Sequence, residues 1–275
     1  MRIELILDNS RPTRIPINYN HPLASCIYKN LGSSSSDYAD RLHNRGYEFG
    51  GKHFKLFTFS QLLASRCRAL GDQLLIQDEA IRWLISSPAD EFVIHFANGI
   101  LDCGRVCIGE VNFPIREVRT VAEPEFTESM RFRCLSPITV STHTDAEGLN
   151  HLQYCRLGDG FYEKIADNLR RKRAVLGSVG SGSNVPAPIV PSLRGGVMQS
   201  TEEQNEHFLE MEFDPLVIAK RQGRIHKLIS YKNTKIFSYY CPFTARGSPE
   251  LMRIGYQCGF GDGNSKGFGM VEVDR

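Results

Sequence analysis

The chain alternates between two hydrophobic periodicities, and their order predicts its secondary structure. The opening RIELILD alternates apolar and polar residues, which predicts a strand. HPLASCIYKNLG then repeats apolar residues at four-residue spacing and predicts a short helix that ends at Gly32. After the polar SSSSD we expect a loop that contains His43, followed by strands in KLFTFS, LLIQ and IRWLIS.

A second helix is predicted after Pro88. In ADEFVIHFANGILD the apolar residues Phe92, Val93, Phe96 and Ile100 fall on one helical face. The segment VCIGEVNFPIREVRTV then returns to strand character, so the first half reads β-α-β-β-α-β.

The second half repeats this plan. MRFRCLSPITVST is predicted as a strand, FYEKIADNLRRKRAVLG as an amphipathic helix, and LVIAKRQGRIHKLISYKNTKIFSYYCPFTARG as several strands before a final MVEV strand. VGSGSNVPAPIVPSLRGG lacks periodic apolar residues and is interpreted as a flexible insertion at about residues 177–205. We therefore predict an α+β fold of two tandem ferredoxin-like (βαββαβ) domains, at residues 1–124 and 125–275.

Composition agrees with a folded protein of this size. The 275 residues are 41% hydrophobic, enough for a core in each domain, and 33 Lys and Arg residues nearly balance 31 Asp and Glu. No segment has the apolar length that spans a bilayer, and the N-terminus carries Arg2, Glu4 and Asp8 where a signal peptide needs an unbroken apolar stretch. We expect a cytoplasmic protein without a membrane partner.

The eight cysteines are scattered singly, and no CxxC pair occurs in the sequence. The closest pair, Cys103 and Cys107, has no neighbouring ligand cluster at zinc-finger spacing. We expect reduced thiols, no metal and no cofactor.

The segment CGFGDGNSKGFGMVEV is the densest glycine cluster of the chain. Closely spaced glycines allow backbone N–H groups to approach phosphates. A kinase-type loop or a dinucleotide fingerprint is not favoured, because only six residues follow Gly269. Glycine content alone also fits a hairpin or bulge that closes a sheet.

GYQCGFGDGNSKGFGMVEV resembles the C-terminal signature of the RAMP superfamily, most closely that of the CRISPR repeat-processing endoribonucleases, the sixth Cas family. IPINYNHPLASCIYKNL, RLHNRGYEFGGKHFKLFTFSQL, LSPITVS and SPELMRIGYQCGFG resemble the same family in the same order. The resemblance implies a RAMP-type pair of ferredoxin-like domains whose glycine-rich segment binds the RNA backbone. Its expected RNA-binding residues are Gly259, Gly261, Gly263, Ser265, Lys266, Gly267 and Gly269.

Cleavage of RNA without a metal requires a base for the 2′-hydroxyl, an acid for the departing 5′-oxygen, and positive charge at the phosphorane. The resemblance places these roles on Tyr28, His43 and Lys55, and leaves open which of Tyr28 and His43 is acid and which is base. Two other interpretations stand beside it: Tyr28 packs in the core, and Lys52 or His53 replaces Lys55.

Two basic clusters are further candidates for phosphate contacts. LRRKR at a helix end presents Arg170, Arg171, Lys172 and Arg173, and KRQGRIHK on a predicted hairpin adds Lys220, Arg221, Arg224 and Lys227. Charge runs are also common on solvated faces that bind nothing.

The leading hypothesis is a metal-independent endoribonuclease that cuts CRISPR precursor RNA within its repeats and leaves a 2′,3′-cyclic phosphate and a 5′-hydroxyl. The alternative is a non-catalytic RAMP-type subunit that binds crRNA in an interference complex and has no need of His43. A nucleotide-binding regulatory domain is a third class. Relatives commonly dimerise, and the sequence leaves a homodimer and interference-complex partners open.

Overall fold

Strand β1 (Arg2–Asp8) lies at the centre of the first domain. It belongs to a five-stranded sheet with the order β5-β8-β1-β10-β9, where β5 is Thr58–Phe59, β8 is Ala80–Ser86, β9 is Arg105–Ile108 and β10 is Val111–Val121. Alternate residues of a strand face the same side, and Ile3, Leu5 and Leu7 are buried in one core with α1 (Asn20–Ser34) and α3 (Asp90–Cys103). The succession β1-α1-β5-β8-α3-β10 is that of a ferredoxin-like domain.

The second domain repeats the topology, as predicted. Its four-stranded sheet has the order β14-β17-β11-β18, and α4 and α7 supply the two helices of the βαββαβ unit. These elements are β11 (Ser129–Cys134), α4 (Phe161–Gly180), β14 (Leu209–Phe213), β17 (Phe243–Gly247), α7 (Pro249–Cys258) and β18 (Val271–Val273). Aromatic rings of Phe132, Phe161, Phe213, Phe243 and Phe260 fill the core between the sheet and the helices.

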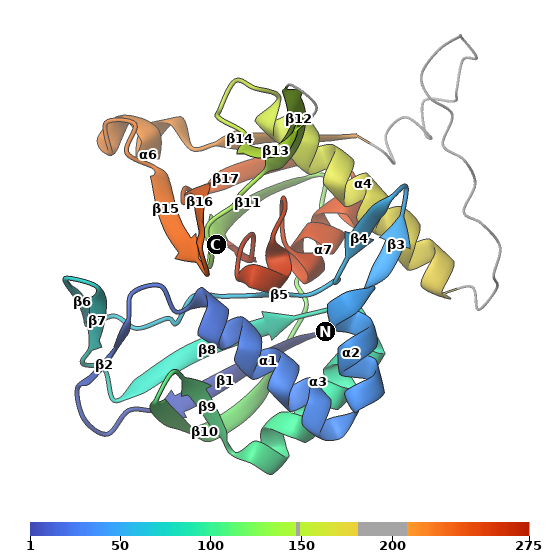
Figure 1. The fold of residues 1–275 in the computed structure, drawn as a ribbon. Coiled ribbons are helices and arrows are strands. Elements are labelled where there is room, and N and C mark those ends of the chain that lie inside the picture. Colours follow the sequence, from blue (N-terminus) through green and yellow to red (C-terminus); the bar gives the residue numbers. More distant parts are fainter. Residues whose placement is uncertain (147–148, 181–207, 275) are drawn as a thin grey trace, which may run out of the picture.

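The computed structural model describes residues 1–146, 149–180 and 208–274. Figure 1 shows the two domains one above the other, with the N-terminus close to their junction. The remaining elements lie outside the two βαββαβ units. In the first domain these are β2 (Thr13–Pro16), α2 (Ser36–Asn44), β3 (Tyr47–Phe49), β4 (Lys52–Phe54), β6 (Cys67–Leu70) and β7 (Gln73–Ile76). In the second domain they are β12 (Ser141–Ala146), β13 (Leu149–Tyr154), α6 (Pro215–Lys220), β15 (His226–Tyr231), β16 (Thr234–Tyr239) and η1 (Asn264–Lys266).

The loop predicted around His43 is wrong, because His43 lies in the last turn of helix α2. Ser35 begins this helix by accepting a hydrogen bond from the Tyr38 N–H, and Tyr38 and Leu42 are buried. The preceding helix α1 also continues past the predicted end at Gly32, to Ser34. The polar SSSSD therefore joins two helices and does not start a loop.

Three predictions for the second half need correction. The strand predicted over MRFRCLSPITVST is interrupted, because β11 ends at Cys134 and β12 begins only at Ser141. LVIAK is not a strand but helix α6, which Asp214 caps by accepting hydrogen bonds from the Leu216 and Val217 N–H groups. Residues 177–180 of the predicted insertion belong to α4, and the rest of it lies outside the described residues.

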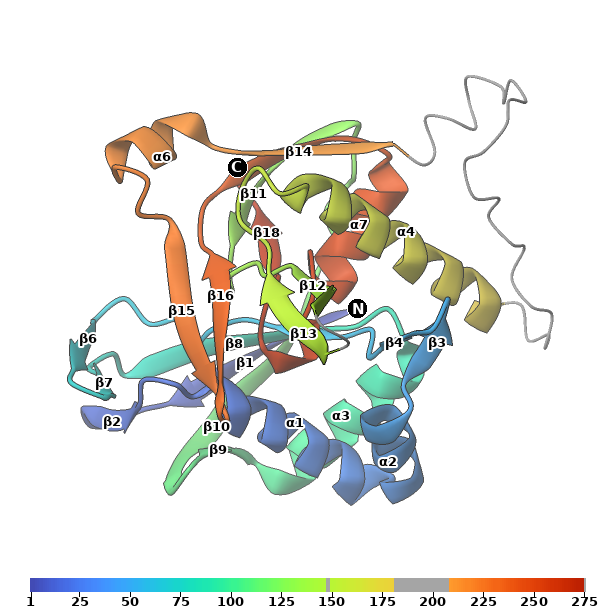
Figure 2. The same cartoon turned by 45° about the horizontal axis from the view of Figure 1, so that its top comes forward.

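Contacts between the domains involve buried polar groups. The Arg2 guanidinium donates hydrogen bonds to the carbonyls of Val271 and Tyr256, at 2.8 and 2.7 Å, and lies over the Tyr256 ring. The hairpin β15–β16 reaches from the second domain to the start of α1 in the first (Figure 2), where the Ser230 N–H donates to Asn18 Oδ1. These contacts fix elements of both domains around one junction.

Candidate functional site

The structure brings Tyr28, His43 and Lys55 together, although they come from three separate elements. Tyr28 of α1 and His43 of α2 meet edge to face, with ring centroids 4.9 Å apart. The Lys55 ammonium lies just beyond α2 and donates hydrogen bonds to the carbonyls of Leu42 and His43, at 2.6 and 2.7 Å. His43 is exposed, whereas Tyr28 and Lys55 are half-buried. A phenol, an imidazole and an ammonium group therefore share one small surface.

A hydrogen bond to Asn44 orients the His43 ring. Nδ1 of His43 lies 3.2 Å from Asn44 Oδ1, and because a carbonyl oxygen only accepts, Nδ1 carries the proton in this arrangement. The Nε2 lone pair is then available to take a proton from a substrate. Burial raises the pKa of Tyr28 above its ordinary value, so its hydroxyl stays protonated at neutral pH.

Gly46 holds the site in a way that the sequence analysis missed. Its φ of +66° is in the left-handed region, and a Cβ there would lie 2.4 Å from the Phe54 carbonyl oxygen and 3.2 Å from Lys55 Nζ. The glycine in RLHNRGY was the sequence feature that could have indicated this close approach of Gly46 to Phe54 and Lys55.

The two alternatives to Lys55 are placed differently from it. Lys52 and His53 are exposed, and His53 forms a hydrogen bond with the Arg45 carbonyl.

The glycine-rich segment, residues 259–269, lies between α7 and β18 and packs against the first domain. Asn20 of α1 donates hydrogen bonds to the carbonyls of Lys266 and Gly267, and Thr58 of β5 donates to that of Phe268. A Cβ at Gly267 would lie 2.6 Å from the Phe59 ring. Four of its expected RNA-binding residues are buried inside the protein: Gly259, Gly261, Gly267 and Gly269.

Lys172 is the main support beneath this segment. It is 2% exposed, and its ammonium donates to the carbonyls of Gly259 and Gly261 and to Asn264 Oδ1, at 2.8, 3.2 and 2.7 Å. Burial lowers the pKa of Lys172 to about 8. The prediction that Lys172 contacts phosphates together with its neighbours in LRRKR is wrong, because its side chain is buried and its ammonium bonds acceptors inside the protein.

The exposed part of the segment is η1 with the residues beside it. The backbone N–H groups of Gly263, Asn264 and Ser265 are consecutive and have no acceptor among the described residues. Lys266 is exposed, and its ammonium lies 5.6 Å from the centroid of the Tyr231 ring. Such a row of N–H groups beside a lysine is suited to an anion.

His21 lies on α1 between the residues around Lys266 and the cluster of Tyr28, His43 and Lys55. Its ring lies edge-on to Tyr231, with centroids 5.3 Å apart, and it stands on α1 seven residues before Tyr28. Seven residues correspond to about 10 Å along a helix. The residues around Lys266 and the pair of Tyr28 and His43 therefore lie close to each other along α1.

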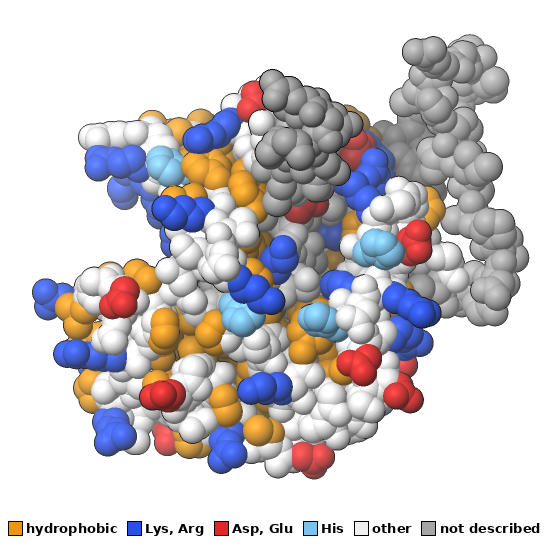
Figure 3. Space-filling model, viewed as in Figure 1, with side chains coloured by type: hydrophobic (Ala, Val, Ile, Leu, Met, Phe, Trp, Pro, Cys, Tyr) orange, Lys and Arg blue, Asp and Glu red, His pale blue; other side chains and the backbone are white. Residues whose placement is uncertain are grey.

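The two basic clusters are placed differently from each other. Arg170, Arg171 and Arg173 lie in the middle of α4 rather than at its end, where Arg170 pairs with Asp167 and Arg173 with Glu250. Arg221 and Arg224 are exposed in the turn between α6 and β15, so the predicted hairpin begins only after them. Lys, Arg and His side chains gather along the hollow between the two domains (Figure 3).

The described residues contain no cluster of three or more His, Cys, Asp and Glu side chains that could hold a metal ion. Within the same residues, no helix is long and apolar enough to cross a membrane.

Two ferredoxin-like domains in tandem, with a glycine-rich segment before the last strand, give this chain the fold of a solved RAMP protein, with a TM-score of 0.76 at 21% identity over 100% of both chains. The chain belongs to the Cas6 family of CRISPR-associated proteins. The family model for the Cas6 N-terminal region matches residues 14–119, and the model for the C-terminal region matches residues 121–273.

Individual relatives cover almost the whole chain. A CRISPR-associated endoribonuclease Cas6 from Methanocaldococcus jannaschii is 31% identical over 273 residues, which are 98% of this chain and 92% of the relative. Cas6 of Pyrococcus furiosus is 26% identical, over 97% of this chain and 86% of its own length. The solved structure of a Cas6-related protein from Pyrococcus furiosus has a TM-score of 0.77 at 22% identity and covers 100% of this chain and 98% of its own.

Proposed function

We propose that this protein is a metal-independent endoribonuclease that cleaves CRISPR precursor RNA within its repeats to give guide RNAs. The observation that carries the proposal is the meeting of Tyr28, His43 and Lys55 on one accessible surface. The endoribonuclease names of the Methanocaldococcus jannaschii and Pyrococcus furiosus relatives support it.

In this mechanism His43 Nε2 takes the proton of the 2′-hydroxyl, and the 2′-oxygen attacks the adjacent phosphorus. The bond from phosphorus to the 5′-oxygen breaks, which leaves a 2′,3′-cyclic phosphate and, after protonation, a 5′-hydroxyl. The Asn44 contact supports His43 as the base, because it keeps the proton on Nδ1.

Lys55 and Tyr28 stabilise the charge that develops on the phosphorane. Two donors of the Lys55 ammonium are used by the carbonyls of α2, which leaves a third for a phosphate oxygen. Burial lowers the pKa of Lys55, which makes it a stronger acid for the departing 5′-oxygen. The neutral Tyr28 hydroxyl donates a hydrogen bond to an oxygen of the reacting phosphate.

The RNA strand then continues along α1 to the glycine-rich segment. The N–H groups of Gly263, Asn264 and Ser265 bind a neighbouring phosphate, and Lys266 adds positive charge. The buried glycines of the segment act indirectly, by letting the chain pack closely enough to present these groups.

The decisive experiment incubates the purified protein with repeat RNA in EDTA. It compares wild type, His43→Ala, and a substrate with a single 2′-deoxy nucleotide at the cut site. We expect cleavage by wild type alone, to products with a cyclic phosphate and a 5′-hydroxyl, while RNA binding persists in all three samples.

The other outcomes are informative as well. Binding without cleavage by wild type would make the protein a non-catalytic RAMP-type subunit. Cleavage that is lost in EDTA and restored by a divalent ion would reject the metal-independent mechanism. Cleavage by His43→Ala at the wild-type rate would remove His43 from the reaction.

A further inference from the structure

Residues 215–240, here called the cationic arm, differ in charge from the rest of the chain. The arm consists of α6, β15 and β16 with their connecting turns. It carries six of the 33 Lys and Arg residues and none of the 31 Asp and Glu residues. The remainder of the chain has 27 Lys and Arg residues against 31 Asp and Glu and is therefore net acidic, so the arm accounts for the net positive charge of the protein. Figure 2 shows that the arm projects from the second domain.

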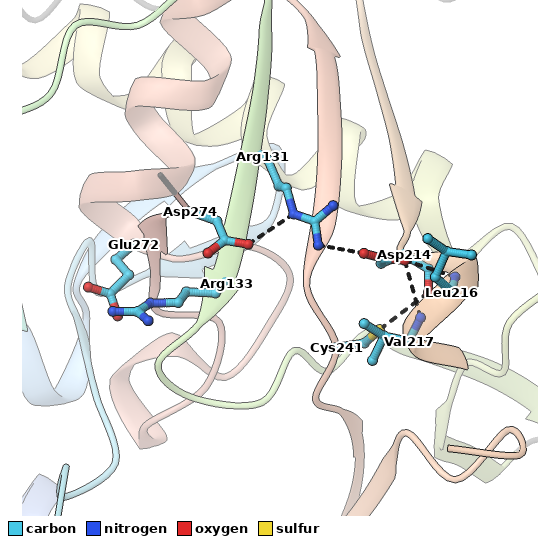
Figure 4. A network of polar contacts seen from close by, with 8 residues as sticks. All are labelled: Arg131, Arg133, Asp214, Leu216, Val217, Cys241, Glu272 and Asp274. Atoms are coloured by element: carbon cyan, nitrogen blue, oxygen red, sulfur yellow. Dashed lines mark hydrogen bonds and ion pairs between the residues drawn. The ribbon is translucent and has the colours of Figure 1, made fainter. Parts of the chain in front are cut away.

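The base of the arm is rigidly held. Asp214 caps α6 with one carboxylate oxygen and accepts a 2.5 Å hydrogen bond from Arg131 with the other, and Arg131 also pairs with Asp274 (Figure 4). Directly after the last residue of the arm, and again at its base, the Cys241 thiol faces the Asp214 carbonyl. The two ends of the arm are thereby tied to the sheet of the second domain.

One face of the β15–β16 hairpin packs inward and the other carries a stack of rings. Ile229 and Ile236 are buried against Phe268 of the glycine-rich segment. On the opposite face, the rings of His226 and Phe237 are stacked at 5.5 Å with an interplanar angle of 16°. The hairpin thus presents the exposed His226 ring to solvent, supported by the half-buried Phe237, which packs against the core of the second domain.

Arg156 extends the aromatic pair from a different element. Its guanidinium, located after β13, lies over the Phe237 ring at 4.0 Å from the centroid. Arg156 and His226 thus both contact the Phe237 ring, and these three side chains are here called the column. Arg156 and His226 are exposed, so two members of the column are accessible.

We propose that this column is a stacking site for unpaired bases of an RNA strand. This inference rests on the proposed function and adds a binding site on the second domain, away from Tyr28 and His43. Bases stack on aromatic rings and on guanidinium planes, and the arm supplies cations for the phosphates between them. The exposed Leu228 beside the column adds apolar contact area.

The test measures fluorescence anisotropy with a labelled oligoadenylate RNA and with an abasic RNA of the same length. Wild type should bind oligoadenylate about tenfold more tightly than the abasic strand, given the strength of base stacking on aromatic side chains. His226→Ala should lower the affinity for oligoadenylate about tenfold and leave the abasic strand unaffected.

Matched variants separate the ring from the charge and from folding. His226→Phe keeps an aromatic ring and should retain the preference for bases, whereas His226→Lys replaces the ring by a cation and should lose it. Arg68→Ala, an exposed arginine on β6 of the first domain, is the control that should change neither affinity. Phe237→Leu provides a second disruption, checked for folding by circular dichroism.

Equal affinity of wild type for the base-bearing and abasic strands would overturn the proposal. So would equal loss with both strands in His226→Ala, or tight binding of polyglutamate that His226→Ala does not change, since the arm would then fit an acidic protein. The cleavage assay with repeat RNA in EDTA distinguishes the two proposals. Base stacking without cleavage would reject only the proposed nuclease activity. Cleavage without base stacking would reject only the proposed stacking site.

Discussion

Lys172 on α4 donates a 2.7 Å hydrogen bond to Asn264 Oδ1 in the glycine-rich segment, 92 residues away along the chain. The same ammonium bonds the carbonyls of Gly259 and Gly261, so all three of its donors are used inside the protein. A residue from a sequence run that resembles a phosphate-binding cluster thus holds together the segment expected to contact RNA.

Replacing Lys172 by Met should therefore destabilise the protein and disorder the glycine-rich segment. Loss of the ammonium leaves buried acceptors without a donor, which costs about 1–3 kcal/mol. Urea unfolding measures this loss, and RNA affinity should fall with it. Lys220→Met, at an exposed lysine, is the control for stability alone, and an equal loss of stability in both variants would contradict the supporting role of Lys172.

The lowered pKa of Lys172 predicts that the difference in stability between wild type and Lys172→Met depends on pH. Below about pH 8 the side chain is protonated in both the native and the unfolded state, and the cost of burying its charge is fully present. Between about pH 8 and the ordinary pKa of 10.5, the unfolded state binds more protons than the native state, so stability rises with pH.

The free energy of unfolding of wild type minus that of Lys172→Met should accordingly be larger at pH 9.5 than at pH 7.5. Subtracting the variant removes the contributions of tyrosines and cysteines that titrate in the same range. A difference that stays constant or falls with pH would show that Lys172 does not titrate in this window.

Gly46→Ala should impair both stability and cleavage. The new Cβ would meet the Phe54 carbonyl and the Lys55 ammonium, and the left-handed backbone adds strain, at a combined cost of about 1–3 kcal/mol. Gly50→Ala is a matched control, because Gly50 also has positive φ but nothing within 4 Å of its added Cβ. Thermal unfolding and cleavage rates are measured for both, and equal losses would mean that backbone strain alone accounts for the effect.

Tyr28→Phe should lower the cleavage rate at saturating RNA by about a hundredfold, the effect of removing one donor to a developing negative charge. The Tyr28 hydroxyl has no hydrogen-bond partner among the described residues, and the ring contacts with His43 and Phe57 are retained in the variant. Stability should therefore change by less than about 0.5 kcal/mol. A large loss of stability with an unchanged rate would assign Tyr28 to the core instead.

The pH profile of the same variant separates Tyr28 from His43. Because burial raises the pKa of Tyr28, the phenol does not titrate near neutrality, and the acidic limb of the profile should persist in Tyr28→Phe. Disappearance of that limb in Tyr28→Phe would assign the titrating group to Tyr28 and exclude His43 as the base.

The sequence by itself determined the repeated βαββαβ plan. Strand alternation in β1 and the helical spacing of Phe92, Phe96 and Ile100 are local patterns that indicate the type of each element, although both faces of β1 are buried in the folded chain. The resemblance carried by RLHNRGY and the glycine-rich segment selected Tyr28, His43 and Lys55, which the fold brings together. The boundary between residues 124 and 125 stays a prediction, although β10 ends at Val121 and β11 begins at Ser129.

Only the tertiary structure decided which side of each polar segment faces solvent. A short polar helix such as α2 is hard to recognise from its sequence, because most of its residues are polar and only Tyr38, Ala39 and Leu42 are buried. The inward turn of Lys172 depends on carbonyls from a distant segment. The same holds for the column of Arg156, Phe237 and His226, whose members come from separate elements and have no common sequence pattern. Local propensity encodes the elements, but burial and charge pairing at a site depend on neighbours that only the folded chain supplies.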